Sequence, residues 1–179
     1  MSISQINIKN EELDDTWVLW YHAVENDHDW SNESFEKLYT IKTIGDYNRL
    51  MNNIPHITSG RFYLMRQGIF PKREDETNIN GGIFSIRISK TMTNATWLEL
   101  TASTIGETLV KDIKLTKFIK GVSIAPKLRN CVFWIWVSDD KYSNRNILNN
   151  DFSHFSLSDI IYSNNRDNLD KFTSNGDKE

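Results

Sequence analysis

The sequence has little of what would indicate a disulfide-stabilised or membrane-inserted protein. Its 179 residues include a single cysteine, Cys131, so no disulfide can form within the chain, and this is typical of proteins from a reducing compartment. No apolar run approaches the roughly 18 residues of a membrane-spanning helix. Residues 1–15 are polar and acidic, unlike a secretory signal. We therefore expect a cytoplasmic protein that is not attached to a membrane.

The chain also lacks a surplus of positive charge. It carries 21 Lys and Arg residues against 24 Asp and Glu residues, a net charge of −3. Proteins that coat nucleic acids without regard to sequence need an excess of cations against the phosphates. A nucleic-acid reader with this charge would have to recognise something local, such as an end or a single base.

Catalytic motifs are absent as well. The chain has no Gly-rich phosphate loop, no paired-histidine metal motif and no nucleophile elbow. Its histidines are scattered, at His22, His28, His56 and His154. Cys131 lies in an apolar run, where it is expected to be buried rather than nucleophilic. We expect a protein that is not an enzyme and that binds no cofactor or metal.

Aromatic residues, by contrast, are abundant, and one tryptophan stands apart from the others. Of the six tryptophans, Trp30 has polar neighbours on both sides, which favours a loop over the core. The run 68–76 combines Gly68 and Pro71 with an acidic end that contains Glu74. An indole face attracts a flat cation, and a carboxylate can accept two N–H donors from the edge of a heterocycle. Trp30 and Glu74 are therefore candidates for a ligand site.

The hydrophobic pattern predicts one α+β domain. Strands are expected at 17–21, 34–41, 61–65, 83–89, 122–124, 132–137 and 160–162. Helices are expected at 43–54, ended by Pro55, at 93–109, and around Ile147, Leu148, Phe152 and Phe155. Antiparallel strands mixed with helices favour helices on one face of the sheet. Residues 1–12 are expected to be a disordered arm, 13–163 the folded domain, and 164–179 a polar tail.

Several segments of the chain, taken in order, resemble a known family. They are Trp17-Val18-Leu19-Trp20-Tyr21, Trp30, Asp46-Tyr47, Gly68-Ile69-x-Pro71-x-x-Glu74-Asp75-Glu76, Gly81-Gly82, Trp97-Leu98-Glu99 and Ile105-Gly106-Glu107. Their order and spacing are similar to those of the eukaryotic translation initiation factor 4E family, the mRNA cap-binding proteins. The resemblance runs from about Leu13 to about Tyr162. It implies a single curved antiparallel sheet, with three helices on its convex face and the cap slot on its concave face.

The resemblance also implies roles for particular residues in binding the 7-methylguanine base of the cap. Trp30 matches the first stacking tryptophan, and Glu74 matches the carboxylate that accepts from guanine N1 and N2. Trp136 matches the tryptophan that touches the N7-methyl group. Trp134 lies two residues away, on the same face of a strand, and is the alternative. For Trp136 and Trp134, core packing is the competing interpretation.

Basic residues are implied for the cap triphosphate. Lys127 and Arg129 fall at positions where the family places phosphate-binding residues, and such contacts position a ligand without reading its base. Solvated charges at a hairpin tip are the other interpretation. Lys111 and Lys114 are the next candidates if these two residues do not bind phosphate.

One position in the expected site departs from the family. Arg73 stands where the second stacking tryptophan would be. A guanidinium can stack on a base, but it repels a cationic one. Phe70, Tyr21 and His28 are candidates for the second face. Loss of one stacking partner costs about 1–3 kcal/mol, so cap binding is expected to be weaker or altered.

The helical face departs too. Asn48 replaces a tryptophan, and Thr101 and Ala102 replace two leucines, on the surface where the family binds scaffold proteins and repressors. Large apolar side chains of this kind are typical hot spots. We expect a monomer that does not bind the usual scaffold in the usual way. A non-standard partner on this face, as in a divergent paralogue or a virus-encoded copy, is the alternative. The alternative function is a cap-binding fold that has lost the cap and serves as an interaction module or translational repressor.

Overall fold

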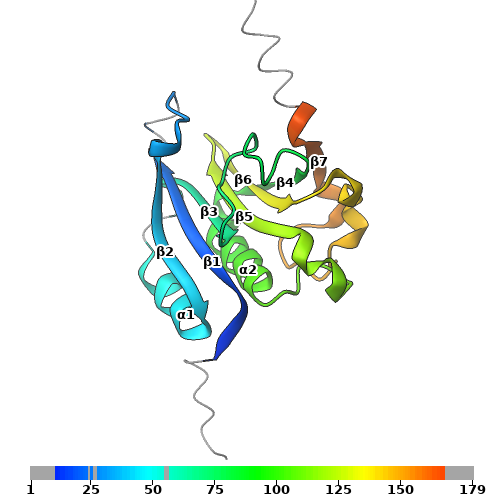
Figure 1. Ribbon diagram of the computed structural model, residues 1–179, viewed down its shortest axis with the longest axis horizontal. Coiled ribbons are helices and arrows are strands. Elements are labelled where there is room, and N and C mark those ends of the chain that lie inside the picture. Colours follow the sequence, from blue (N-terminus) through cyan, green and yellow to red (C-terminus); the bar gives the residue numbers. More distant parts are fainter. Residues whose placement is uncertain (1–10, 24, 26–27, 55–56, 168–179) are drawn as a thin grey trace, which may run out of the picture.

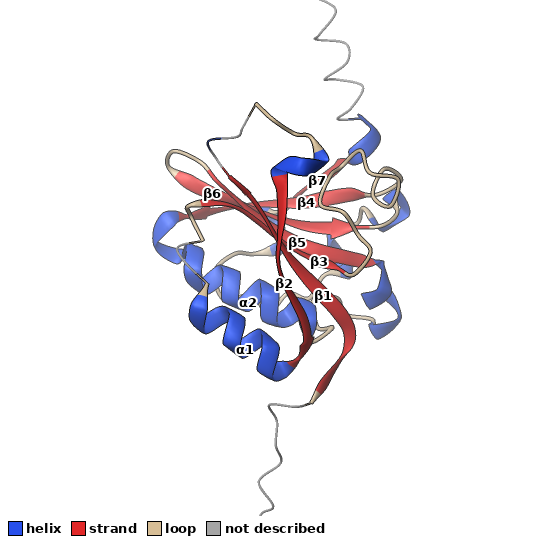
Figure 2. Ribbon diagram, turned by 60° about the vertical axis from the view of Figure 1, so that its left-hand side comes forward, coloured by secondary structure: helices blue, strands red, loops and turns tan. Residues whose placement is uncertain are grey.

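One antiparallel sheet of seven strands carries two α-helices on the same face (Figure 1 and Figure 2). The computed structural model describes residues 11–23, 25, 28–54 and 57–167. The strand order is β2-β1-β3-β5-β6-β4-β7. The strands are β1 (Glu12–Ala23), β2 (Phe35–Thr43), β3 (Gly60–Arg66), β4 (Gly82–Ser89), β5 (Ile119–Pro126), β6 (Asn130–Val137) and β7 (Ile161–Asn164). The predicted α+β fold is confirmed.

Helix α1 (Ile44–Asn53) begins where the sequence indicates. Thr43 and Asp46 form a capping box, in which the Thr43 hydroxyl accepts from the Asp46 amide and the Asp46 carboxylate accepts from the Thr43 amide. The carboxylate also accepts from the amide of Lys42, and these hydrogen bonds lower the pKa of Asp46. The helix ends at Asn53, and Pro55, predicted to stop it, lies outside the described residues.

Helix α2 (Thr93–Ile105) is shorter than predicted. The expected range reached Leu109, but the helix ends at Ile105 with Gly106 as its C-cap. Glu107 then adopts a left-handed backbone conformation, with φ of 56°. Leu109 is still buried, because the chain after the turn brings it back against the core. The apolar spacing that suggested a longer helix therefore reflects burial and not helical periodicity.

The predicted third helix is wrong. The region contains 3₁₀ turns at Arg145–Ile147 and Leu157–Asp159 instead. The Asn144 side chain caps the first turn, and the side chain of Asn149 accepts from the amide of Asn150. Asn and Asp side chains compete for the backbone donors that a helix needs. Phe152 and Phe155 nevertheless stack, with ring centroids 4.5 Å apart.

The sheet separates two apolar clusters. The larger one, the helix-side core, includes Trp17, Phe84, Trp97 and Cys131, each at most 1% exposed. The predicted burial of Cys131 is confirmed. The smaller one, the concave-face cluster, contains Phe35, Tyr63, Met65, Ile83 and Trp136, with Trp20, Ile69, Phe70 and Trp134 packed against it.

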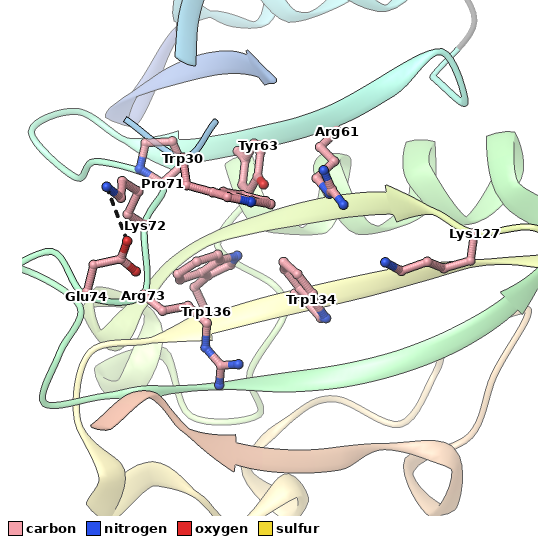
Figure 3. A pocket seen from close by; sticks show the side chains of 10 residues that line it. All are labelled: Trp30, Arg61, Tyr63, Pro71, Lys72, Arg73, Glu74, Lys127, Trp134 and Trp136. Atoms are coloured by element: carbon pink, nitrogen blue, oxygen red, sulfur yellow. Dashed lines mark ion pairs between the residues drawn. The ribbon is translucent and has the colours of Figure 1, made fainter. Parts of the chain in front are cut away.

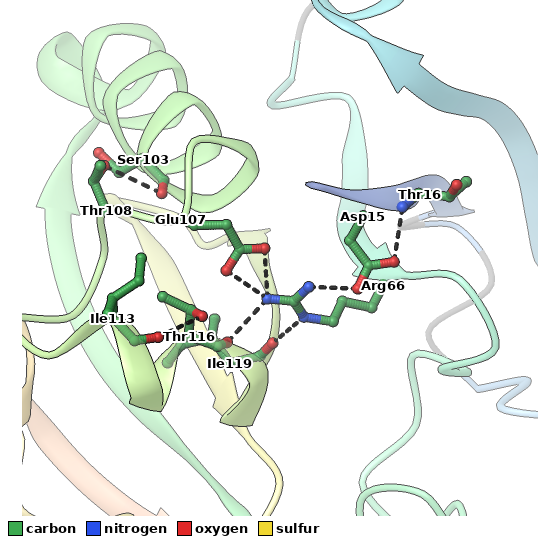
Figure 4. A network of polar contacts seen from close by, with 9 residues as sticks. All are labelled: Asp15, Thr16, Arg66, Ser103, Glu107, Thr108, Ile113, Thr116 and Ile119. Carbon is green, nitrogen blue, oxygen red and sulfur yellow. Dashed lines mark hydrogen bonds and ion pairs between the residues drawn. The ribbon is translucent and has the colours of Figure 1, made fainter. Parts of the chain in front are cut away.

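A buried arginine fastens the end of β3 to three neighbouring segments (Figure 4). The Arg66 guanidinium donates to Asp15 on β1 at 2.6 Å and to Glu107 after α2 at 2.8 Å. It also donates to the carbonyls of Ile119 and Thr116, and it lies 4.5 Å from the Trp17 ring centroid. These contacts hold the guanidinium in one position. Arg66 therefore ties β1, the segment after α2 and the start of β5 together.

The ends of the chain fall mostly outside the described residues. Of the expected arm and tail, only residues 11–12 and 164–167 are described. Strand β1 begins at Glu12, and strand β7 ends at Asn164. The part of the chain that the structure describes contains no helix that could span a bilayer. The same part of the chain holds no group of three metal-capable side chains.

Candidate functional site

A cavity of about 530 Å³ opens on the concave side of the sheet (Figure 3). Its lining consists of Trp30, Arg61, Tyr63, Pro71, Lys72, Arg73, Glu74, Lys127, Trp134 and Trp136. In Figure 3, Glu74 lies at one end and Lys127 at the other, with Trp136 and Trp134 between them. Trp30, Glu74, Trp136, Trp134 and Lys127 are all predicted site residues. The fold therefore gathers side chains that are far apart in the sequence.

Trp30 is held in the loop that follows β1. The His22 ring stacks on it, with centroids 4.5 Å apart and planes inclined by 11°. His22 is fully buried, and its Nε2 bonds to the carbonyl of Asp29, next to Trp30. Trp30 keeps 41% of its surface exposed and lines the cavity. His22 therefore supports the ring by stacking, and the guanidinium carbon of Arg61 also lies over it, 4.8 Å from the ring centroid.

The loop that carries Glu74 is built on polar contacts within and around it. Gly68 turns the chain after β3, with φ of 85°. The amide of buried Asn78 donates to the carbonyls of Phe70 and Lys72, and buried Asn165 donates in turn to the Asn78 carbonyl. These bonds fix the backbone on both sides of Pro71, which places the Glu74 side chain at the end of the cavity.

Glu74 has a cationic partner in this structure. Lys72 Nζ lies 3.2 Å from a Glu74 carboxylate oxygen and donates to the Asn32 side chain at 3.3 Å. Asn32 belongs to the 3₁₀ turn just after Trp30. Lys72 thus bridges the two loops that carry Trp30 and Glu74, and sequence reasoning did not identify it. Its position within the charged run 72–76 is the only signal that the sequence offers for it.

Arg73 does not point its guanidinium toward Trp30. Its Nε donates to Asn165 at 2.8 Å, and one Nη donates to the Ser163 hydroxyl at 2.9 Å, so the group is bound to β7 and the residues after it. Burial lowers the pKa of Arg73, opposed by the charge of Glu74. The position aligned with a second stacking residue is therefore occupied by a side chain that is committed elsewhere.

The other candidates for the second face lie apart from the cavity lining. Phe70 packs edge-on against Trp20 and Phe35, at 5.3 Å from each. Tyr21 is packed against the helix-side core, on the opposite face of the sheet. His28 is exposed in the loop before Trp30. The aromatic rings that do line the cavity opposite Trp30 are Trp136 and Trp134 (Figure 3).

Trp136 and Trp134 share the concave face of β6, as their spacing predicts. Their centroids are 6.2 Å apart, with planes inclined by 74°. Trp136 is 1% exposed, and its Nε1 donates to Ser123 at 2.9 Å. Trp134 is partly exposed. The former is a fixed part of the cavity floor, and the latter presents more surface to a ligand.

The predicted phosphate residues separate in the structure. Lys127, just after β5, lines the cavity, whereas Arg129 is exposed at the hairpin tip and does not. Lys111 and Lys114 lie before β5 and line no part of it; Lys111 donates to the Asn146 carbonyl. Arg61, on β3, is a lining cation that sequence reasoning missed. It is 6% exposed, and its guanidinium carbon lies 4.8 Å from the Trp30 ring centroid.

The expected partner surface is only partly exposed. Asn48 on α1 and Ala102 on α2 are exposed. Thr101 is fully buried, and its hydroxyl bonds to the hydroxyl of Tyr47 at 2.9 Å. Leu98, one helical turn before Ala102, is 47% exposed. Thr101 is therefore part of the packing between α1 and α2 and not of the surface. The exposed residues of this face are Asn48, Leu98 and Ala102.

Comparison with known proteins identifies one family. The family described as "Eukaryotic initiation factor 4E" matches residues 12–179. The chain is 28% identical over 142 residues to an initiation factor 4E homolog of Acanthamoeba polyphaga mimivirus, covering 67% of this chain and 52% of that protein. It is 28% identical over 138 residues to the Saccharomyces cerevisiae factor, covering 72% and 63%. The chain thus spans about half to two thirds of the length of these curated relatives.

Solved structures of similar proteins share the fold. An Ascaris suum eIF4E-3 in complex with the m7G cap superposes with a TM-score of 0.67 at 26% identity, over 74% of this chain and 76% of that one. A C. elegans eIF4E-3 bound to the 4E-binding protein Mextli and a cap analog reaches 0.73 at 20% identity, over 89% and 95%. The chain belongs to the eukaryotic initiation factor 4E family, as a distant member. Its membership also agrees with the prediction that it is not an enzyme.

Proposed function

We propose that this protein binds the 7-methylguanosine 5′ cap of mRNA and acts in translation initiation or its control in the cytoplasm. The observation that carries the proposal is that Trp30, Glu74 and Lys127 line one cavity, although they come from three separate segments. Trp30 offers an aromatic face, Glu74 an acceptor pair and Lys127 a cation. A methylated guanine nucleotide needs these three features, because its base is flat and cationic and its phosphates are anionic.

The cap would be oriented by the two ends of the cavity. The base stacks on Trp30, and its N1 and N2 donors meet Glu74. The N7-methyl group faces Trp136 and Trp134, and the phosphates extend toward Lys127, with Arg129 beyond it. Because the Arg73 guanidinium is bound to β7, stacking from a second side is weaker. Missing one stacking contact lowers the affinity by about 1–3 kcal/mol.

Retention on a 7-methyl-GTP matrix tests the proposal. We expect retention that is competed by free 7-methyl-GTP but not by GTP. Trp30→Ala and Glu74→Ala should each abolish or severely weaken it, because they remove the stacking face and the charge-assisted hydrogen bonds. Arg49→Ala, on the helical side of the sheet, is the control. Retention that survives both substitutions would place the cap elsewhere or show that it is not bound.

A protein-interaction module without cap affinity is the second candidate. Two observations favour it: the lost stacking position at Arg73, and the Lys72 ion pair that already neutralises Glu74. In that case wild-type protein would pass through the matrix, and its partner would bind the helical face at Asn48, Leu98 and Ala102.

A further inference from the structure

The concave face continues past the cavity toward the β5–β6 hairpin, and its side chains there form regular rows. Trp134 pairs with Ser123 on one side and with Ser85 on the other, and Ser123 pairs with Tyr63. One row nearer the hairpin, Val132 pairs with Ala125 and with Arg87. Trp134 and Tyr63 of the first row line the cavity, whereas Val132, Ala125 and Arg87 of the second row do not.

Arg61 completes the second row. Phe62 pairs with Ile124, so the residue before it, Arg61, lies beside Ala125. The row therefore reads Arg61, Ala125, Val132, Arg87 across β3, β5, β6 and β4. Neighbouring strands are about 4.8 Å apart, so the backbones of the two arginines are separated by roughly 14 Å. Between them lies a low floor of an alanine and a valine.

Arg87 points to the same face as Trp134. Its neighbours Ile86 and Ile88 are in the helix-side core, so Arg87 projects from the opposite side of β4. It is exposed, and no ion pair involves it among the residues that the structure describes. Arg61 reaches the cavity from its own end of the row (Figure 3). Lys127 lies just beyond the floor, at the end of β5.

We propose that Arg61 and Arg87 flank a track for the phosphates of the RNA chain that follows the cap. The inference rests on the proposed function only for the direction in which the RNA leaves the cavity. Arg61, inside the cavity, contacts the phosphates nearest the cap. Arg87, outside it, contacts the RNA backbone further along. The net charge of −3 gives little general attraction, so this local pair of cations supplies the electrostatic contact.

If the track exists, the two arginines contribute to the binding of different ligands. Binding is measured for 7-methyl-GTP, a short capped oligonucleotide and the same oligonucleotide without a cap. Arg87→Met should lower the affinity for the capped oligonucleotide about tenfold and leave the affinity for 7-methyl-GTP unchanged. Arg61→Met should weaken both. The slope of log affinity against log salt should fall by about 1 for each lost contact on RNA.

Matched variants keep the result interpretable. Arg49→Met removes the same charge from α1, where the side chain is 66% exposed, and should leave the affinity for both ligands unchanged. Because Arg61 is nearly buried, Arg61→Lys retains the charge and should recover part of the lost affinity, while thermal unfolding checks the fold. Capped-oligonucleotide binding by Arg87→Met that equals wild type, with an unchanged salt slope, overturns the track.

The outcomes separate the track from cap binding. If 7-methyl-GTP binds normally and Arg87→Met has no effect on RNA, the track is wrong and the cap function stands. If wild type does not bind 7-methyl-GTP but binds uncapped RNA through Arg87, the track stands and the cap function is wrong. If wild type binds neither ligand, both proposals are wrong.

Discussion

The two sides of the sheet contain the same kinds of aromatic residue in opposite situations. On the helix side, Trp17 and Trp97 are at most 1% exposed and pack among aliphatic side chains. On the concave side, Trp30 is 41% exposed and lies beside Arg61, Lys72 and Glu74. Residue type alone therefore does not separate the fold from the site. The polar and charged neighbours of each ring do, and each variant below tests one side against the other.

The largest effect is expected from removing a tryptophan of the helix-side core. Trp97→Ala should lower the free energy of unfolding by about 3–5 kcal/mol, because it leaves a large cavity beneath α2. Trp30→Ala should lower it by only about 1 kcal/mol, the loss of one stacked ring pair, while abolishing cap retention. Chemical denaturation measures both. Equal destabilisation by the two variants would mean that Trp30 is part of the folding core.

The next largest effect on the free energy of unfolding is expected for Arg66. Arg66→Met leaves the Glu107 carboxylate buried without its cation, since that side chain is 8% exposed, and we expect a loss of about 3 kcal/mol in unfolding free energy. The Asp15 pair contributes less because Asp15 is 44% exposed.

Arg49→Met is the matched control for this buried ion pair. It breaks an exposed i,i+3 pair with Asp46 and should cost no more than about 0.5 kcal/mol. A similar cost for Arg49→Met and Arg66→Met would show that the buried network adds nothing beyond a surface pair.

These contrasts also show what the sequence could predict. Alternation of apolar with polar residues located β4, and Thr43 with Asp46 located the start of α1, because both signals are local. The third helix failed because the asparagines at 144 and 149 bind backbone amides in turns. No local signal could have revealed Arg61 and Arg87 as one row, because that row depends on pairing across β3, β5, β6 and β4.

A smaller effect is expected at Lys72. It pairs with Glu74 at 3.2 Å, so under the proposed function it would compete with the base for the carboxylate and repel a cationic ring. Lys72→Met should raise the preference for 7-methyl-GTP over GTP by about 1 kcal/mol, roughly fivefold. Lys72→Arg keeps the charge and should leave the preference unchanged. If Lys72→Met lowers the preference instead, Lys72 orients Glu74 and does not compete for it.

The smallest expected effect is an absence of binding on the helical face. Relatives such as the C. elegans eIF4E-3 are solved with 4E-binding proteins, but here the exposed residues are the short Asn48 and Ala102 beside Leu98. Each buried CH₂ that they lack is worth about 0.8 kcal/mol. Titration of a helical peptide built on a tyrosine and a leucine should therefore give no saturation at micromolar concentrations.

The double variant Asn48→Trp with Ala102→Leu should gain measurable affinity without unfolding the protein, because both sites are exposed. Thr101 must stay a threonine, because its hydroxyl bonds to Tyr47. Micromolar or tighter binding by the wild type would mean that Leu98 alone anchors the peptide and that the two replacements do not alter partner choice.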